Sequence, residues 1–117
     1  MESNLISGFT PKADAHELKT RLEWGQPGCT ILDVRDWWTF NSAHIKGAIP
    51  MPLSELASRA KTSLSAKREI YVYGENDQHT AQAVQVLRGA GFAHVSELVG
   101  GLSAWKSAGG PVEGAGA

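Results

Sequence analysis

The segment from Gly74 to Thr80 is the first candidate for chemistry, because it joins a predicted strand to a predicted helix. It reads Gly74-Glu75-Asn76-Asp77-Gln78-His79-Thr80. A loop of this kind can hold an anion, since its backbone N–H groups converge and the helix N-terminus adds partial positive charge. A cysteine there would react as a thiolate. The first position is instead glycine, which has no side chain to form a covalent intermediate.

The charges of this segment oppose the binding of dianions. Glu75 and Asp77 flank the mouth of the loop, and His79 carries no fixed charge at pH 7. A dianion such as phosphate would meet two carboxylates and no fixed cation. We therefore expect weak binding of dianions, although the amides could still hold a water or a chloride.

Cys29 is the only cysteine in the chain, so no internal disulfide can form. It comes just before the predicted strand Thr30–Val34, whereas sites in open parallel sheets form at the carboxyl ends of strands. At about 3.3 Å per strand residue, Cys29 should lie roughly 15 Å or more from Gly74. We interpret it as an incidental, half-buried thiol.

Other polar and aromatic residues near the predicted strand ends are weaker candidates. Asp33 and Arg35 sit at the carboxyl end of a strand, and we interpret them and His44 as structural hydrogen-bonding groups that support the site. Trp37 and Trp38 are consecutive on a short helical turn, so both can hardly face the core. They form a candidate partner surface.

Turn residues and apolar runs divide the chain into alternating strands and helices. Thr10-Pro11 predicts the start of the first helix, which continues to near Trp24. The further predicted helices are 36–41, 54–60, 80–90 and 102–108, and the predicted strands are 30–34, 47–50, 70–73 and 94–98. Gly91 should end the fourth helix as an αL cap. This order predicts an α/β fold with a mostly parallel sheet covered by helices on both faces.

Composition limits the function classes and the domain count. The 117 residues suit one domain, and 11 Lys plus Arg balance 12 Asp plus Glu, which predicts no partner among nucleic acids or membranes. The histidines lack metal-ligand spacing, so we predict no metal and no cofactor; they are His16, His44, His79 and His94. The N-terminus is not a secretory signal, and the expected location is cytoplasmic. We expect a lead-in over 1–9, a domain over 10–112 and a flexible tail over 113–117.

Three ordered blocks of the sequence resemble the rhodanese-like (sulfurtransferase-homology) family. The first is Ile31-Leu32-Asp33-Val34-Arg35, then Phe40 and Ala43-His44-Ile45-Lys46-Gly47-Ala48-Ile49-Pro50. The second is Ile70-Tyr71-Val72-Tyr73 with its loop and helix, ending in Leu87-Arg88-Gly89-Ala90-Gly91-Phe92, and the third is Leu98-Val99-Gly100-Gly101-Leu102-Ser103-Ala104-Trp105. The resemblance spans about 10–112 and implies the single-domain rhodanese fold, a five-stranded, mainly parallel sheet with flanking helices.

The departures from the family pattern are concentrated in the loop. The family's catalytic cysteine falls on Gly74, its loop glycine on Asp77 and its loop arginine on His79. Thr39 replaces the first-block glutamate and Ala43 the first-block glycine. The blocks that build the fold are retained, and the block that carries the chemistry is not.

The resemblance implies a function that these departures modify. In active rhodaneses the loop thiolate takes sulfur from a donor and holds it as a persulfide. We interpret the chain as a catalytically inactive homologue that acts as a regulatory or protein-binding module in sulfur metabolism, with an unknown protein or a small anion as partner. The alternative is an active sulfurtransferase using Cys29 or a cysteine of another chain. A phosphatase-like activity ranks last, because it also needs the loop cysteine and arginine.

Overall fold

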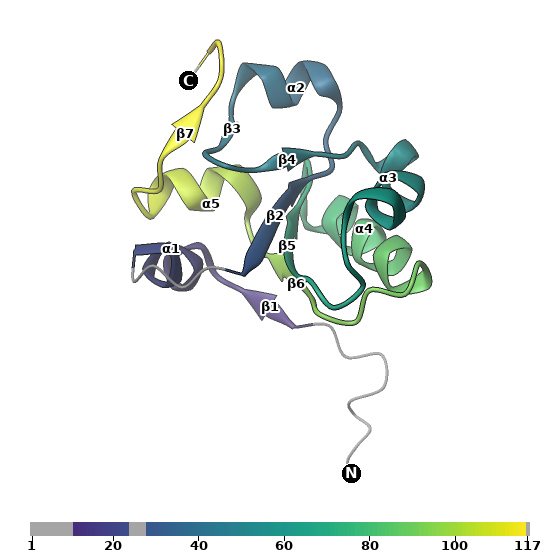
Figure 1. Ribbon diagram of the computed structural model, residues 1–117. Helices are drawn as coiled ribbons and strands as arrows, with labels where there is room; N and C mark the ends of the chain where they lie inside the picture. Colours follow the sequence, from purple (N-terminus) through teal and green to yellow (C-terminus); the bar gives the residue numbers. More distant parts are fainter. Residues whose placement is uncertain (1–10, 24–27, 117) are drawn as a thin grey trace.

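The strands form a parallel sheet in the order β1-β6-β5-β2-β4, as the computed structural model shows for residues 11–23 and 28–116 (Figure 1). The five strands are β1 (Lys12–Ala13), β2 (Cys29–Asp33), β4 (Ile49–Pro50), β5 (Glu69–Tyr73) and β6 (Val95–Leu98). The helices are α1 (Ala15–Glu23), α2 (Trp37–Ser42), a 3₁₀ turn (Leu53–Glu55), α3 (Leu56–Ser63), α4 (Asp77–Gly89) and α5 (Gly101–Ser107). The predicted fold class is therefore confirmed.

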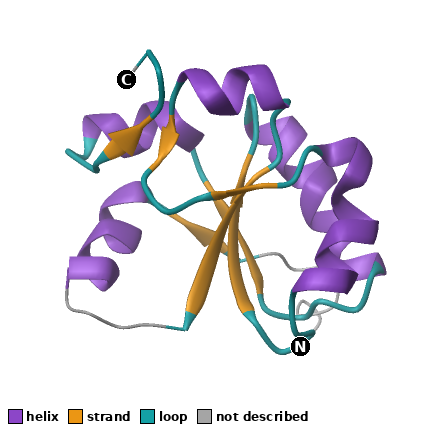
Figure 2. Ribbon diagram, turned by 45° about the horizontal axis from the view of Figure 1, so that its top comes forward, coloured by secondary structure: helices purple, strands orange, loops and turns teal. Residues whose placement is uncertain are grey.

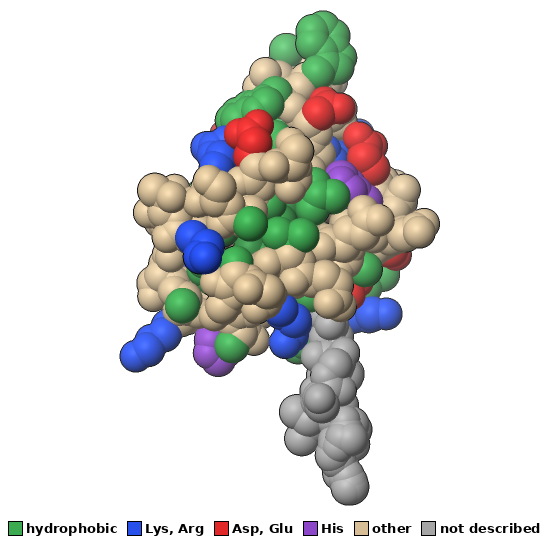
Figure 3. All heavy atoms as spheres, turned by 90° about the vertical axis from the view of Figure 1, so that its right-hand side faces the viewer, with side chains coloured by type: hydrophobic (Ala, Val, Ile, Leu, Met, Phe, Trp, Pro, Cys, Tyr) green, Lys and Arg blue, Asp and Glu red, His purple; other side chains and the backbone are tan. Residues whose placement is uncertain are grey.

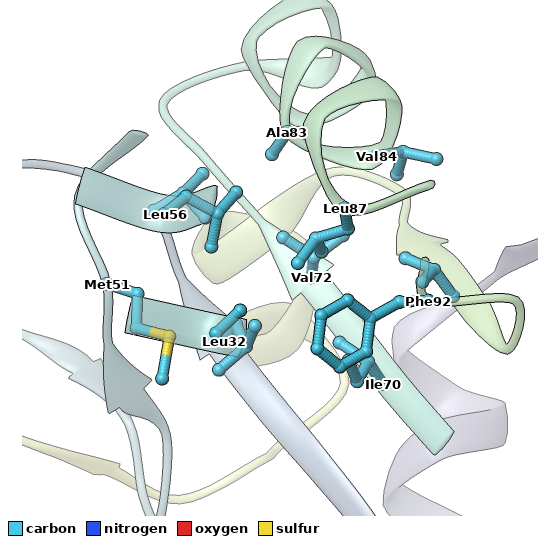
Figure 4. Close-up of a cluster of buried hydrophobic side chains, with 12 residues drawn as sticks. Leu32, Met51, Leu56, Ile70, Val72, Ala83, Val84, Leu87 and Phe92 are labelled. Carbon is cyan, nitrogen blue, oxygen red and sulfur yellow. The ribbon is translucent and has the colours of Figure 1, made fainter. Parts of the chain in front are cut away.

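Helices cover both faces of this sheet, because its central strands are apolar on both sides. On one face, α3 and α4 pack Leu56 and Leu87 onto Leu32, Ile70 and Val72 (Figure 4). Figure 2 shows the strands crossing between this layer and the helices on the opposite side. None of the helices in the described ranges is long and apolar enough to cross a membrane.

The opposite face buries the alternate residues of the same strands. Ile31 and Tyr73 point there, against Leu18 of α1, Phe40 of α2 and Trp105 of α5. Trp105 is almost fully buried, and its indole N–H donates to the Pro111 carbonyl (2.8 Å). Trp105 thus packs the last helix against the sheet. The period-two alternation along β2 and β5 thus divides the core into two layers.

The central pairing fixes which strand ends meet. β2 and β5 run parallel in register, with Cys29 opposite Glu69 and Asp33 opposite Tyr73. The residues that follow the two strands therefore emerge at one edge of the sheet. Phe92, labelled beside Leu87 in Figure 4, follows Gly91, whose positive φ of 100° confirms the predicted αL cap of α4.

The first helix begins later than the sequence predicts. Thr10 lies outside the described residues, and Pro11 precedes β1, where its carbonyl accepts from the Glu97 N–H (2.9 Å). The helix start predicted at Thr10-Pro11 is therefore wrong. Asp14 is the residue that caps α1: its carboxylate accepts from the Glu17 N–H (2.7 Å), and Glu17 accepts from the Asp14 N–H (3.2 Å). This is a capping box.

Loss of this cap should destabilise the protein modestly. Asp14→Ala is expected to lower the free energy of unfolding by about 1 kcal/mol, because the first turn of α1 loses one acceptor. Urea unfolding followed by circular dichroism measures the change, and Asp14→Asn, which keeps an acceptor, is the matched control. A loss equally large in Asp14→Asn would contradict the capping explanation.

The C-terminal segment is held against the domain as far as residue 116. β7 (Val112–Glu113) pairs antiparallel with β3 (His44–Ile45), and the N–H groups of Ala115 and Gly116 donate to the carbonyls of Asn41 and Ser42. The tail expected to be flexible over 113–117 is therefore hydrogen-bonded to β3 and α2 over its described part. The backbone pairing that holds it connects residues far apart in sequence.

Candidate functional site

A pocket of about 290 Å³ lies where β2 and β5 end and where α4 and α5 begin. Its lining comes from three segments, which are Arg35, residues 74–77 and residues 100–103. The sequence prediction placed the candidate loop at this edge. Asp77, Gln78, His79 and Thr80, however, belong to the first turn of α4 rather than to a loop before residue 80, because Asn76 caps the helix.

Three backbone N–H groups of the candidate loop donate to the loop's own side chains. The Gly74 N–H donates to Oγ1 of Thr80 (2.8 Å), and the Glu75 N–H donates to Nδ1 of His79 (3.0 Å). The His79 N–H donates to Oδ1 of Asn76 (2.8 Å). An incoming anion would have to displace these internal acceptors before it could bind the same amides.

Asp77 connects the loop to the second turn of the pocket. Its carboxylate Oδ1 accepts from the Gly100 N–H (3.0 Å). This backbone N–H at the start of α5 could otherwise have donated to an anion, but it already donates to a carboxylate. Gly100 and Gly101 form a tight turn at the start of α5, and both have positive φ, 79° and 53°.

The imidazole of His79 occupies the space beside Gly74. A Cβ built on Gly74 would lie 2.6 Å from Nδ1 of His79, closer than real Cβ atoms approach their neighbours. Gly74 has a negative φ, so the backbone at this position could accept another residue. Glycine at 74 and the inward position of His79 are therefore coupled: any side chain at 74 requires the imidazole to move.

Asp33 and Arg35 form a buried ion pair behind the pocket. Nη2 of Arg35 lies 2.6 Å from Oδ2 of Asp33 and also donates to the Ala43 carbonyl (2.6 Å). Burial disfavours the charged guanidinium, but the hydrogen bonds to Asp33 outweigh it and hold the pKa of Arg35 above its ordinary value. Because this guanidinium is already neutralised, it offers little net charge to a ligand.

Tyr73 links this ion pair to the core, a contact that sequence reasoning missed. Its ring lies under the Arg35 guanidinium, 5.3 Å from centroid to Cζ, and its hydroxyl accepts from the Ile45 N–H (3.1 Å). Burial, followed by the charge of Asp33, raises the pKa of Tyr73 above its ordinary range. The alternation along β5 placed Tyr73 on a buried face, but only the fold brings it to Arg35.

His44 lies outside the lining of the pocket. Its Nδ1 donates to the Phe40 carbonyl (2.7 Å), its ring stacks on Phe40 with centroids 3.7 Å apart, and its Nε2 faces Glu113 at 3.4 Å. These contacts tie α2 to β3. They match the hydrogen-bonding role that the sequence indicated, and they give His44 no direct part in the pocket.

Cys29 and the two consecutive tryptophans lie outside the lining of this pocket. Cys29 is the first residue of β2, at the end of the strand away from Gly74, and it is half-buried. It lines a different pocket, together with Lys46 and Arg68. Trp38 is 82% exposed and Trp37 43% exposed, so both reach solvent from α2.

Known proteins share both this fold and much of the sequence. The chain superimposes on the rhodanese-like domain of the Alr3790 protein from Anabaena sp. with a TM-score of 0.88 and 59% identity, covering 92% of this chain and 82% of that one. The class is thus a small parallel α/β domain of rhodanese type. The rhodanese-like domain family matches residues 14–108, and the chain belongs to that family.

Two of the curated relatives carry names that refer to sulfur chemistry. The putative sulfur carrier protein YrkF of Bacillus subtilis is 33% identical over 86% of this chain and 48% of its own length. The thiosulfate sulfurtransferase PspE of Escherichia coli is 35% identical over 61% of this chain and 68% of its own length. The chain spans about half the length of YrkF, so it matches one part of that protein.

Proposed function

We propose that this domain is a rhodanese-homology module that binds a protein partner in the cytoplasm and turns over no sulfur donor itself. The observation that supports it most is the pairing of Gly74 with His79. By the family resemblance Gly74 stands at the nucleophile position, and the imidazole takes the space that a side chain there would need. The names of the relatives favour sulfur metabolism as the setting.

The chemistry of sulfur transfer explains why this pairing matters. A thiolate attacks the outer sulfur of thiosulfate, the S–S bond of the donor breaks, and sulfite leaves with the bonding electron pair while the sulfur stays on the enzyme as a persulfide. Gly74 offers no atom for that bond. The internal acceptors on the Gly74, Glu75 and His79 amides also leave the outgoing anion fewer free donors.

Incubation with thiosulfate and cyanide tests the proposal. We expect thiocyanate formation at the rate of the protein-free control, and Cys29→Ser should behave like the unaltered protein. An active rhodanese assayed in parallel shows that the conditions support turnover. Thiocyanate formed above background and abolished by Asn76→Ala or His79→Ala would overturn the proposal.

The alternative site is Cys29, which one structural observation favours. The pocket of about 300 Å³ that it lines also contains Lys46 and Arg68, whose cations could attract an anionic sulfur donor. Mass spectrometry after treatment with thiosulfate decides between the two sites. We expect no added mass on the Cys29 peptide, whereas a gain of about 32 Da, one sulfur atom, would support the alternative.

A further inference from the structure

We propose that α2 and the adjacent acidic mouth of the pocket form a docking surface for a cationic, arginine- or lysine-rich segment of a protein partner. We call the exposed Trp37 and Trp38 with Asp36, Glu75 and Asp77 the α2 surface. The inference rests on the proposed binding function and specifies the chemistry of the partner. It favours a basic peptide over the small anion that the loop geometry first suggested.

The aromatic part of the α2 surface is held rigidly. The Asp36 carboxylate caps α2 by accepting from the Thr39 N–H (2.8 Å), and Phe40 is buried in the core below. Trp37 is fixed by neighbours on the next elements: its indole N–H donates to Glu55 (3.4 Å), and the Arg59 guanidinium lies 5.2 Å from its ring centroid. Trp38 is left 82% exposed on a helix that cannot easily turn it inward.

The charge at this end of the molecule is mainly acidic, although the whole chain has a net charge of only −1. The basic group beside it is the half-buried Arg59, which lies over Trp37 and already faces Glu55. In residues 34–43, 51–56, 74–81 and 98–103, every exposed Asp, Glu, Lys or Arg is acidic: Asp36, Glu55, Glu75 and Asp77. In the described part of the chain, no Lys or Arg lies within ion-pair distance of Asp36, Glu75 or Asp77. Figure 3 shows hydrophobic and acidic side chains at the end that carries α2, with basic side chains beside them.

The exposed indole of Trp38 and the acidic side chains around it both favour a cationic ligand. The carboxylates attract guanidinium or ammonium groups, and an exposed indole binds the same groups through its π face. The protein already makes this contact internally, where Arg59 lies over Trp37 and faces Glu55 at 3.6 Å. A partner arginine over Trp38, beside Asp36, would repeat that arrangement. A phosphopeptide, a nucleic acid or an anionic membrane would be repelled.

Titration with a hexa-arginine peptide tests the surface, with tryptophan fluorescence and the indole N–H resonances of the unaltered protein as readouts. We expect saturable binding that weakens as salt rises, since exposed charges are screened. Hexaglutamate and vesicles of phosphatidylserine should not bind. Binding of either in preference to hexa-arginine would overturn the proposal, as would the absence of hexa-arginine binding at millimolar concentration.

Variants locate the binding. Trp38→Ala should weaken hexa-arginine binding about threefold, the size of one exposed cation–π contact. The triple variant Asp36→Asn/Glu75→Gln/Asp77→Asn keeps the oxygens that accept from the Thr39 and Gly100 N–H groups but removes three charges, and should weaken binding about tenfold. The matched controls Leu22→Ala and Glu23→Gln alter an exposed apolar and an exposed acidic residue of α1 and should leave binding unchanged.

The controls also separate this inference from the proposed function. Equal losses in the α1 controls and in the α2 variants would mean non-specific attraction and would overturn the docking surface. That result, with thiocyanate still at background, leaves the inactive binding module standing. Thiocyanate turnover would overturn the proposed function, whatever the peptide does.

Discussion

Replacing Asp33 by alanine is expected to lower the free energy of unfolding by about 3–5 kcal/mol, the cost of leaving a buried charge without its partner. Asp33 is fully buried and Arg35 is 7% exposed. The carboxylate accepts from both the side chain and the backbone N–H of Arg35, so all these bonds are lost together. Urea unfolding monitored by tryptophan fluorescence measures the loss.

Two further variants show that the buried charge causes the effect. Glu23→Ala, which removes an exposed carboxylate paired with Lys19, should change stability by less than about 0.5 kcal/mol. The double variant Asp33→Leu/Arg35→Met, which removes both charges, should regain much of the loss. If Asp33→Ala lowers the free energy of unfolding by less than about 1 kcal/mol, the buried ion pair does not stabilise the fold as its geometry indicates.

The architecture was predictable because its signals are local. The apolar run of β2, the aromatic and β-branched run of β5 and the helical spacing in α4 each extend over at least four residues, and their order determines a parallel sheet. The strands that the sequence missed, β1, β3 and β7, have two residues each. No periodicity exists over two residues, and their extended conformation depends on partners far away in the chain.

The position of the candidate site was predictable from the sequence, but the hydrogen bonds within its loop were not. The strand-to-helix junction placed residues 74–80 at the carboxyl edge, and the structure brings Arg35 and residues 100–103 to the same pocket. The bonds from the Gly74 and Glu75 amides to Thr80 and His79 depend on where α4 begins. Asn76-Asp77 is a helix-start signal that could have moved this boundary three residues earlier.

Introducing a thiol at the family's nucleophile position should expose the coupling between residues 74 and 79. Gly74→Cys places its Cβ against Nδ1 of His79, so the imidazole must rotate and give up the bond from the Glu75 N–H. We expect a loss of about 1–2 kcal/mol in stability. Gly89→Cys, at the far end of α4, is the control, because a Cβ there meets nothing within 4 Å.

A double-mutant cycle isolates this contact. His79→Ala alone should cost about 1 kcal/mol through its lost acceptor, and Gly74→Cys in the His79→Ala background should cost much less than in the unaltered protein. Additive losses would contradict the steric explanation, because the clash involves the imidazole alone.

The engineered thiol also tests why the loop lacks turnover. Its pKa, followed by alkylation rate against pH, should lie below the free-cysteine value of about 8.5, because the N-terminus of the 13-residue helix α4 remains.

Thiocyanate turnover should still stay low in Gly74→Cys, since His79 supplies no fixed cation and Glu75 and Asp77 repel thiosulfate. It should rise at least tenfold when His79→Arg, Glu75→Gln and Asp77→Gly are added, because each change favours the dianion. Full activity from Gly74→Cys alone would mean that the missing sulfur atom, rather than the altered charge of the loop, is the only barrier to catalysis.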